Sequence, residues 1–285
     1  MVKDLNIKIV GLGDGGARTI SKMIATGIGK NKSVEFLAVG KDENILLTSE
    51  AQKNIFLNRD LTTVYKNLAD GLDGANVIFI VAGLAGNAAR AAVPLITTCA
   101  KNLNAVTVAF VCRPAIIENI PRKMNATHTL EKLRNVDTLF VVPAEKFLVF
   151  RLNQPQISLD ELFEVADDVF CQGVKIFLDM LLDGDTNLAL FKWGNAAFGY
   201  GEGSTALDAV KNAVNFPTLE ADDLSGATGI FLRLASGKTL PLKSIDAANN
   251  FIQKQIPPDA GFFSQEEKVP ALGEKVFASI ILTRK

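Results

Sequence analysis

Valine, isoleucine and phenylalanine gather in short runs along the first half of the chain, each bounded by polar residues or glycine. Such runs predict buried β-strands at Ile7–Val10, Glu35–Val39, Val77–Val81, Ala105–Val111 and Thr138–Val142. Between them, apolar residues recur with helical spacing at Ala17–Thr26, Thr62–Gly71 and Ala88–Asn102. This alternation predicts an α/β fold with a mostly parallel sheet, whose ligands bind where the strands end.

One segment, residues 158–182, carries a helical apolar stripe well beyond the usual helix length. Ser158 and Glu161 match a capping box at its start, and Asp183-Gly184-Asp185 ends it. After it the rhythm changes, and we expect helices at Ser204–Asn215 and Ser244–Gln255 and strands at Thr228–Ala235 and Val276–Thr283. These patterns predict two domains, residues 1–182 including the long helix and a smaller α+β domain over residues 183–285.

Composition narrows the class of protein. The chain has 285 residues, 48% of them hydrophobic, and a formal charge of −1, so it has no general attraction for nucleic acid or anionic membranes. No run reaches the ~18–20 apolar residues that a membrane span needs, and we expect a cytoplasmic protein without membrane insertion. One histidine and three widely spaced cysteines exclude a zinc site and indicate reduced thiols.

The stretch KIVGLGDGGARTISKM, residues 8–23, contains Gly11, Gly13 and Gly16 in the spacing G-x-G-x-x-G. Glycines after a strand let the backbone approach a phosphate, and the next helix offers N–H donors. This serves NAD and nucleoside triphosphates alike, and Asp42 is placed to hold a ribose in the NAD alternative. Asp14 either forms an Asp-Gly turn or binds a cation, because a carboxylate within ~5 Å of a phosphate costs on the order of a few kcal/mol.

Segments along the whole chain resemble FtsZ, the bacterial relative of tubulin. GLGDGGARTISKMI with EFLAVGKD resembles its first two nucleotide loops, and IFIVAGLAGNAARAAVPLI stands at its tubulin signature. TVAFVCRPAIIENIPRKM, VDTLFVVPAEKFL, FEVADDVFCQGVKIF, PTLEADDLSGATGIFLRLASG, PPDAGFF and GEKVFASIILT follow in the family's order. The resemblance implies a Rossmann-like nucleotide-binding domain joined by a long central helix to a smaller α+β C-terminal domain.

The resemblance also implies a guanine-nucleotide site. Its residues are Gly11, Gly13, Asp14, Gly15, Gly16, Ala17, Arg18, Gly86, Asn87, Arg90, Glu118, Arg122, Phe163 and Asp167. Asp167 falls on the family's guanine-contacting position and Phe163 on the stacking aromatic. Glu118 and Arg122 match its acidic and basic positions, although four residues apart they also suit an ordinary surface pair.

Several positions depart from the FtsZ pattern. The tubulin signature keeps only Gly83 and Gly86, while Ala88 and Ala89 remove side-chain donors. Arg90 either grips an anion by a new route or is a solvated surface side chain. Arg18 replaces an asparagine that contacts nucleotide, and the loop before residue 61 that covers the γ-phosphate is shortened.

The catalytic loop of the family has also collapsed, here to DGDTN. Asp183 and Asp185 either remain as catalytic remnants or simply cap the helix. The resemblance thus leaves enzyme activity open, with hydrolysis expected to be weak or lost. GTP or GDP binds or the site has no nucleotide, and Mg²⁺ is expected only with GTP.

We therefore predict an FtsZ-like cytoskeletal or cell-division protein, a pseudo-GTPase that associates with itself in a head-to-tail filament or dimer, or with FtsZ. The alternative is an active GTP-hydrolysing FtsZ homologue in which Arg90 and Arg18 replace lost contacts. A Rossmann-type oxidoreductase explains only residues 8–42. FtsZ's adaptor-docking C-terminal peptide is not seen, so either the chain is trimmed or it does not bind those adaptors directly.

Overall fold

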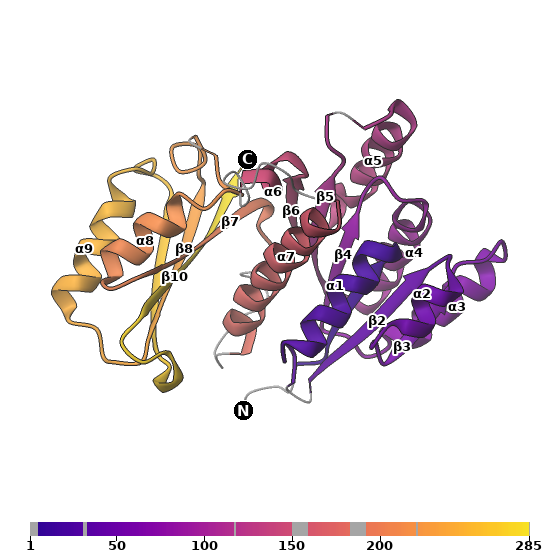
Figure 1. Cartoon of the computed structure of the whole chain (residues 1–285), viewed down its shortest axis with the longest axis horizontal. Coiled ribbons are helices and arrows are strands. Elements are labelled where there is room, and N and C mark those ends of the chain that lie inside the picture. Colours follow the sequence, from indigo (N-terminus) through magenta and orange to yellow (C-terminus); the bar gives the residue numbers. More distant parts are fainter. Residues whose placement is uncertain are drawn as a thin grey trace. The chain divides into compact units, whose positions relative to one another are not determined.

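The computed structural model describes residues 5–30, 33–116, 118–149, 159–182, 192–220 and 222–284. The chain forms two compact units, Met1–Lys192 and Trp193–Lys285 (Figure 1). Ser158, Asp183 and Asp185 lie outside the described residues, so the capping box and the catalytic remnants stay predictions. The predicted domain boundary at residues 182 and 183 adjoins this gap.

A parallel sheet forms the centre of the first unit. Its strands are β1 (Ile7–Leu12), β2 (Val34–Gly40), β3 (Lys53–Phe56), β4 (Val77–Gly83), β5 (Val106–Arg113) and β6 (Thr138–Pro143). They lie in the order β3-β2-β1-β4-β5-β6, with every described pair parallel. The direction of strand addition therefore reverses between β1 and β4, and their ends form the switch point of this sheet.

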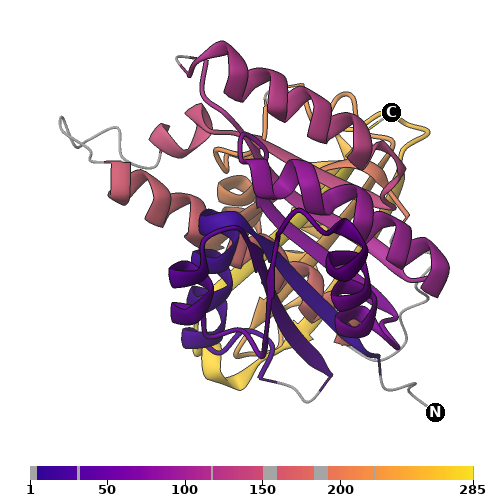
Figure 2. The same cartoon turned by 90° about the vertical axis from the view of Figure 1, so that its right-hand side faces the viewer.

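Helices lie on both faces of this sheet (Figure 2). The helices are α1 (Gly13–Ala25), α2 (Glu43–Thr48), α3 (Leu61–Leu72), α4 (Asn87–Leu103), α5 (Ile120–Lys132), α6 (Glu145–Val149) and α7 (Leu159–Leu182). Helix α4 packs between α3 and α5, whereas α1 packs beside α7. The sheet is buried on both faces, which explains why its strands are continuous apolar runs rather than alternating ones.

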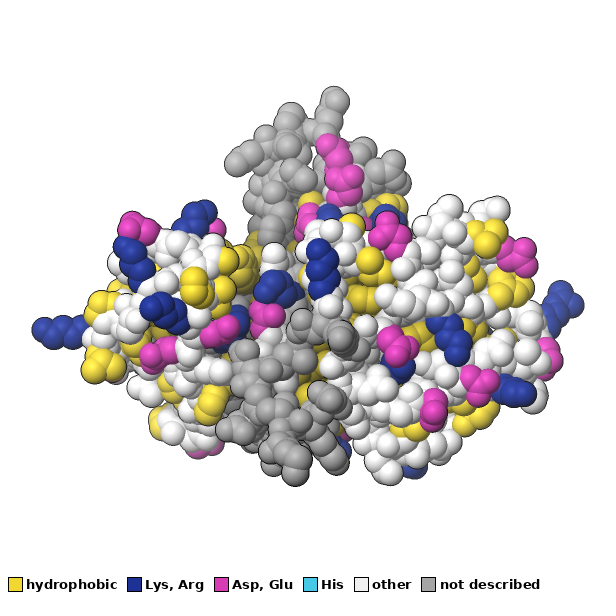
Figure 3. Space-filling view, turned by 90° about the horizontal axis from the view of Figure 1, so that it is seen from below, with side chains coloured by type: hydrophobic (Ala, Val, Ile, Leu, Met, Phe, Trp, Pro, Cys, Tyr) yellow, Lys and Arg dark blue, Asp and Glu magenta, His cyan; other side chains and the backbone are white. Residues whose placement is uncertain are grey.

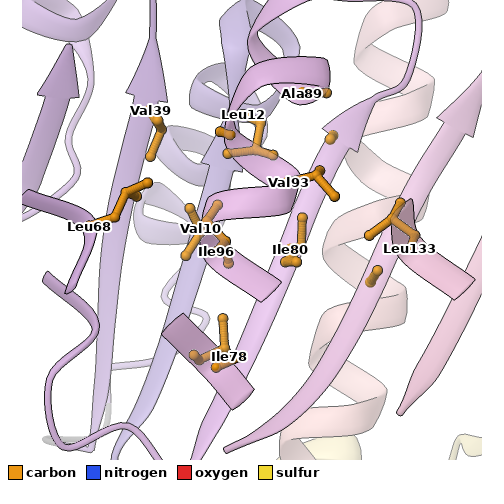
Figure 4. Packing of buried hydrophobic residues seen from close by; sticks show 14 of the residues in the cluster. Val10, Leu12, Val39, Leu68, Ile78, Ile80, Ala89, Val93, Ile96 and Leu133 are labelled. Atoms are coloured by element: carbon orange, nitrogen blue, oxygen red, sulfur yellow. The ribbon is translucent and has the colours of Figure 1, made fainter. Parts of the chain in front are cut away.

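Each face of the sheet has its own apolar core. Under α3, α4 and α5, side chains such as Val10, Ile80, Val93 and Ile96 interdigitate (Figure 4). On the other face the ring of Phe177 from α7 meets Phe79, Phe110 and Phe140 edge-on, with ring centroids 5.7, 6.4 and 6.0 Å away. Aromatic contacts of this kind fix the long helix on the sheet.

The predicted elements of the first unit are present, with one boundary that matters for the site. Helix α1 begins at Gly13 rather than at Ala17. Gly13 has φ +69°, which lets the chain turn directly from β1 into the helix. Asp14 therefore lies in the first turn of α1, and the predicted Asp-Gly turn is wrong. Strand β3 escaped prediction because Ile55 is its one buried residue.

The second unit is a mixed sheet of the order β7-β10-β8-β9. Its elements are β7 (Gly194–Gly203), α8 (Ala206–Val214), β8 (Gly229–Ser236), α9 (Leu242–Gln253), β9 (Gly261–Lys268) and β10 (Val276–Arg284). Strand β10 runs antiparallel to β7 and β8, while β8 and β9 are parallel. The inward face of β8 and the helices α8 and α9 share one apolar core.

Strand β7 carries glycine where a strand would normally carry branched residues. Gly199, Gly201 and Gly203 all face α8, and a Cβ on Gly201 would lie 2.3 Å from the Ala209 carbonyl oxygen and 2.3 Å from the Ala213 nitrogen. Only glycine lets the helix backbone approach this closely. The same glycines deprive β7 of a strand-like apolar pattern, which is why the sequence did not predict it.

The surface carries no single-sign field on the face seen in Figure 3, where lysine, arginine, aspartate and glutamate are interspersed. Within the described ranges, no helix combines the length and the apolar character that a membrane crossing needs.

We expect Gly201→Ala to destabilise the second unit by about 1–3 kcal/mol, because the added methyl overlaps the α8 backbone. Urea unfolding followed by circular dichroism measures the loss. Gly261→Ala is the matched control, since a Cβ there would meet only the Thr228 carbonyl oxygen at 3.9 Å. Equal stability of the two variants would contradict this account of the helix–sheet contact.

Candidate functional site

The switch point between β1 and β4 brings the glycine-rich loop into contact with both strands. A Cβ on Gly11 would lie 2.4 Å from the Gly16 carbonyl oxygen, and one on Gly16 would lie 2.7 Å from that of Val81. The first and last glycines therefore let the start of α1 press against the ends of β1 and β4. This places the loop at the edge where ligands of open α/β sheets bind.

There is open space beside the first turn of α1 and beside the end of β4. An added Cβ on Gly15 or on Gly83 would meet nothing within 4 Å, and neither α1 nor α4 has a side-chain hydrogen bond at its N-cap. Asp14 is exposed in the first turn of α1, where its negative charge opposes a second anion. The loop thus keeps its donors and adds a repulsive charge.

Ala88 and Ala89, which stand in the tubulin signature, belong to the apolar core. They are 8% and 1% exposed and pack with the cluster under α4. The Ala88 methyl also lies against the loop, since a Cβ on Gly13 would be 3.3 Å from it. These positions therefore give apolar contacts and offer no hydroxyl to a ligand.

Arg90 is held by a neighbouring helix. Its Nη1 donates to Asn125 Oδ1 of α5 at 3.2 Å, and Asn125 Nδ2 donates to Asn87 Oδ1 at 3.4 Å. Arg90 is thus an exposed side chain bonded to α5, and the alternative in which it grips an anion stays a prediction. Asn125 was missed by sequence reasoning, because the contact joins residues 35 positions apart.

Arg18 of α1 reaches across to α7. Its Nε donates to Asp167 Oδ2 at 2.5 Å and its Nη2 to Oδ1 at 3.4 Å, while its Cζ lies 4.9 Å from the centroid of the Phe163 ring. The Thr19 hydroxyl lies 2.5 Å from Asp167 Oδ1. Next to this group, Lys22 pairs with Asp168 at 2.6 Å. Two cations on α1 therefore match two adjacent carboxylates on α7.

Burial dominates the electrostatics of Asp167, whose side chain is 3% exposed. Desolvation raises the pKa of this carboxyl above its ordinary value, although the hydrogen bonds from Arg18 and Thr19 act against the rise. Burial also raises the pKa of Cys171 to about 12 and that of Cys112 to about 12. Both thiols therefore stay protonated at neutral pH and are poor nucleophiles.

Glu118 and Arg122 form an ion pair with each other at the start of α5. Glu118 also accepts from the Ala115 backbone nitrogen at 3.0 Å, so the pair stabilises the local turn. Asp42, the acid of the NAD alternative, caps α2 by accepting from the Asn44 nitrogen at 2.9 Å. Its Oδ1 thus caps this helix, and the oxidoreductase alternative still explains only residues 8–42.

These features define a class. The chain is an α/β protein whose parallel sheet carries a glycine-rich loop at its switch point, and it continues through the long helix α7 and a separate α+β unit. Comparison with known proteins finds similar chains along nearly the whole length of this one.

The model of the FtsZ family C-terminal domain matches residues 194–284. Over 97% of its length the chain is 29% identical to cell division protein FtsZ 1 of Thermococcus kodakarensis, of which it covers 80%. It is similar to an empty FtsZ dimer of M. jannaschii, with TM-score 0.82, 27% identity and 98% and 88% of the two chains covered. A GTPgS-bound protofilament of CetZ2 from Haloferax volcanii shares the fold, with TM-score 0.79, 16% identity and 98% and 93% covered.

The chain resembles FtsZ along nearly its whole length, and its residues 194–284 match the C-terminal domain of the FtsZ family. The predicted resemblance and the predicted α/β fold class, with its mostly parallel sheet, are confirmed. The proteins it resembles in sequence are described as cell division protein FtsZ 1 and as FtsZ.

The described residues do not fit a guanine base in the pose that the resemblance implies. Arg18 already engages both Asp167 and Phe163, the side chains assigned to the base. Thr19 and Lys22 complete the contact and were missed by sequence reasoning. Their signal was present, because Arg18 and Lys22 are four residues apart on α1 and oppose the acidic pair Asp167 and Asp168.

We expect Arg18→Ala to destabilise the fold by about 1–3 kcal/mol near neutral pH, toward the lower end because the arginine side chain is 43% exposed. The pKa of Asp167 already lies above 3.8, and losing Arg18 raises it further. The folded variant therefore binds this proton more tightly than the wild type. Its stability deficit widens as pH rises from about 4 and narrows in acid.

Urea unfolding at about pH 4.5 and pH 7.5 measures this pH dependence. Arg59→Ala, which removes an exposed arginine of the same unit, is the control and should show a deficit that does not change with pH. A deficit of Arg18→Ala that is equally independent of pH would contradict the role given to Arg18.

Proposed function

We propose that this chain is an FtsZ-like cytoskeletal or cell-division protein that associates with itself or with FtsZ and hydrolyses GTP weakly or not at all. Self-association is supported by relatives that are described as a dimer and as a protofilament. Loss of hydrolysis is supported above all by the start of α4, where Ala88 and Ala89 are buried in the core. Methyl groups there replace the donors that a triphosphate needs.

Two further observations support weak triphosphate binding. Asp14 adds a negative charge at the open helix start, and the cation at Arg90 is bonded to Asn125 of α5. The alternative of an active GTPase requires Arg90 and Arg18 to replace the lost contacts. Both guanidinium groups have protein partners instead.

Without hydrolysis, assembly has no chemical trigger for disassembly, so its extent depends on concentration or on a partner. Head-to-tail stacking is heterologous and open, and it gives filaments rather than closed dimers. Weak or absent hydrolysis thus predicts that the extent of assembly does not depend on the nucleotide.

Sedimentation of the full chain over a concentration series tests this proposal, with GTP and Mg²⁺, with GDP, and without nucleotide. We expect the same pelleted fraction in all three conditions and no phosphate release above the protein-free background. Sustained phosphate release would establish the active GTPase instead, and pelleting that strictly requires GTP would refute nucleotide-independent assembly. Failure to pellet at every concentration, alone or with an assembling FtsZ, would refute the association.

We also expect Asp14→Asn to bind inorganic tripolyphosphate at least about tenfold more tightly than the wild type, because a unit charge ~5 Å away opposes the anion by about 3 kcal/mol. Titration calorimetry at low salt measures the affinity. Asp70→Asn, on an exposed position of α3, removes the same charge elsewhere and should bind like the wild type. If Asp14→Asn binds tripolyphosphate no better than Asp70→Asn does, the charge of Asp14 does not weaken anion binding at the loop.

A further inference from the structure

Two groups contact the guanidinium of Arg18, and a third holds one of them in place. The Asp167 carboxylate receives two of its N–H donors, the Phe163 ring lies under its face, and the Thr19 hydroxyl holds the same carboxylate oxygen that Nη2 reaches. We call Phe163, Asp167 and Thr19 the guanidinium site. Such a site is built for a planar group that offers adjacent donors at its edge and a flat face to an aromatic ring.

The burial of the parts suits a receptor rather than a chance surface pair. Asp167 is 2% exposed and Thr19 is 2% exposed, whereas Phe163 presents 45% of its surface. The carboxylate is therefore fixed in a desolvated position, while the aromatic face stays accessible. A ligand entering over Phe163 would meet a carboxylate that already accepts hydrogen bonds from Arg18 and Thr19.

The chemistry of this site selects among planar bases. Guanine presents N1–H and its exocyclic amino group side by side, which is the same donor fork as a guanidinium. Adenine presents a donor beside an acceptor and would place its ring nitrogen against the carboxylate. The site therefore prefers guanine or a guanidinium over adenine.

We propose that Arg18 is the resident occupant of the guanidinium site and that its side chain excludes guanine from Asp167 and Phe163. This inference rests on the proposed function, because it explains why the part of the same site that would hold the base does not bind guanine. Two factors favour Arg18 over a free base. It is cationic, and it is tethered one residue from Thr19, so that it competes at an effective concentration of about millimolar or more.

Titration with guanosine tests the exclusion, because a nucleoside lacks the phosphates on which the proposed function depends. We expect Arg18→Ala to bind guanosine at least about tenfold more tightly than the wild type and the Arg59→Ala control. Adenosine should not gain affinity. Methylguanidinium should raise the melting temperature of Arg18→Ala but not that of the wild type, and Asp167→Asn in the Arg18→Ala background should abolish both effects.

Equal guanosine binding by wild type and Arg18→Ala, or none by a folded Arg18→Ala, would overturn the exclusion. Should that variant fail to fold, the Nε–H signal of Arg18 in the NMR spectrum of the wild type decides. We expect it to exchange slowly and to shift when Phe163 is replaced by leucine, and a fast-exchanging signal that ignores Phe163→Leu would overturn the proposal. If the wild type binds guanosine but does not hydrolyse GTP, this inference alone is overturned and the proposed function is unaffected.

Discussion

A buried carboxylate must be paired, and in this protein that requirement joins α1 to α7. Asp167 lies in the interior, and burial raises its pKa. Arg18 and Thr19 of α1 supply the cation and the hydroxyl that reduce the free-energy cost of burying this carboxylate. The pair fixes the glycine-rich loop, which begins the same helix, relative to the long helix. It also occupies two side chains that a ligand would otherwise use, so one contact links stability and function.

The phosphate side follows a different physical rule. Small residues at the start of α4 can either offer hydroxyl groups and bare backbone to a ligand or fill the core, and Ala88 and Ala89 fill the core. The fold survives this exchange because α4 buries its apolar side regardless of what stands at its first turn. This FtsZ-like scaffold can therefore keep its architecture while the residues at the start of α4 differ from the FtsZ pattern.

The second unit shows that close backbone packing can replace side-chain volume. Glycines on β7 let α8 lie directly on the strand, and the apolar residues of β8 and β10 complete the core beside it. This unit contains the match to the FtsZ C-terminal domain.

Hydrophobic patterning by itself determined the parallel sheet, because strands that are buried on both faces are continuous apolar runs. Helical spacing determined the long helix over 159–182 and the helices flanking the loop. The patterning missed β7, which carries three glycines on its inward face, and it placed the start of α1 at Ala17. Motif order pointed to the family. Only the tertiary structure decided that Arg18 meets Asp167 and that Arg90 meets Asn125, because these partners are 149 and 35 positions apart and a charge pattern does not say which helices lie side by side.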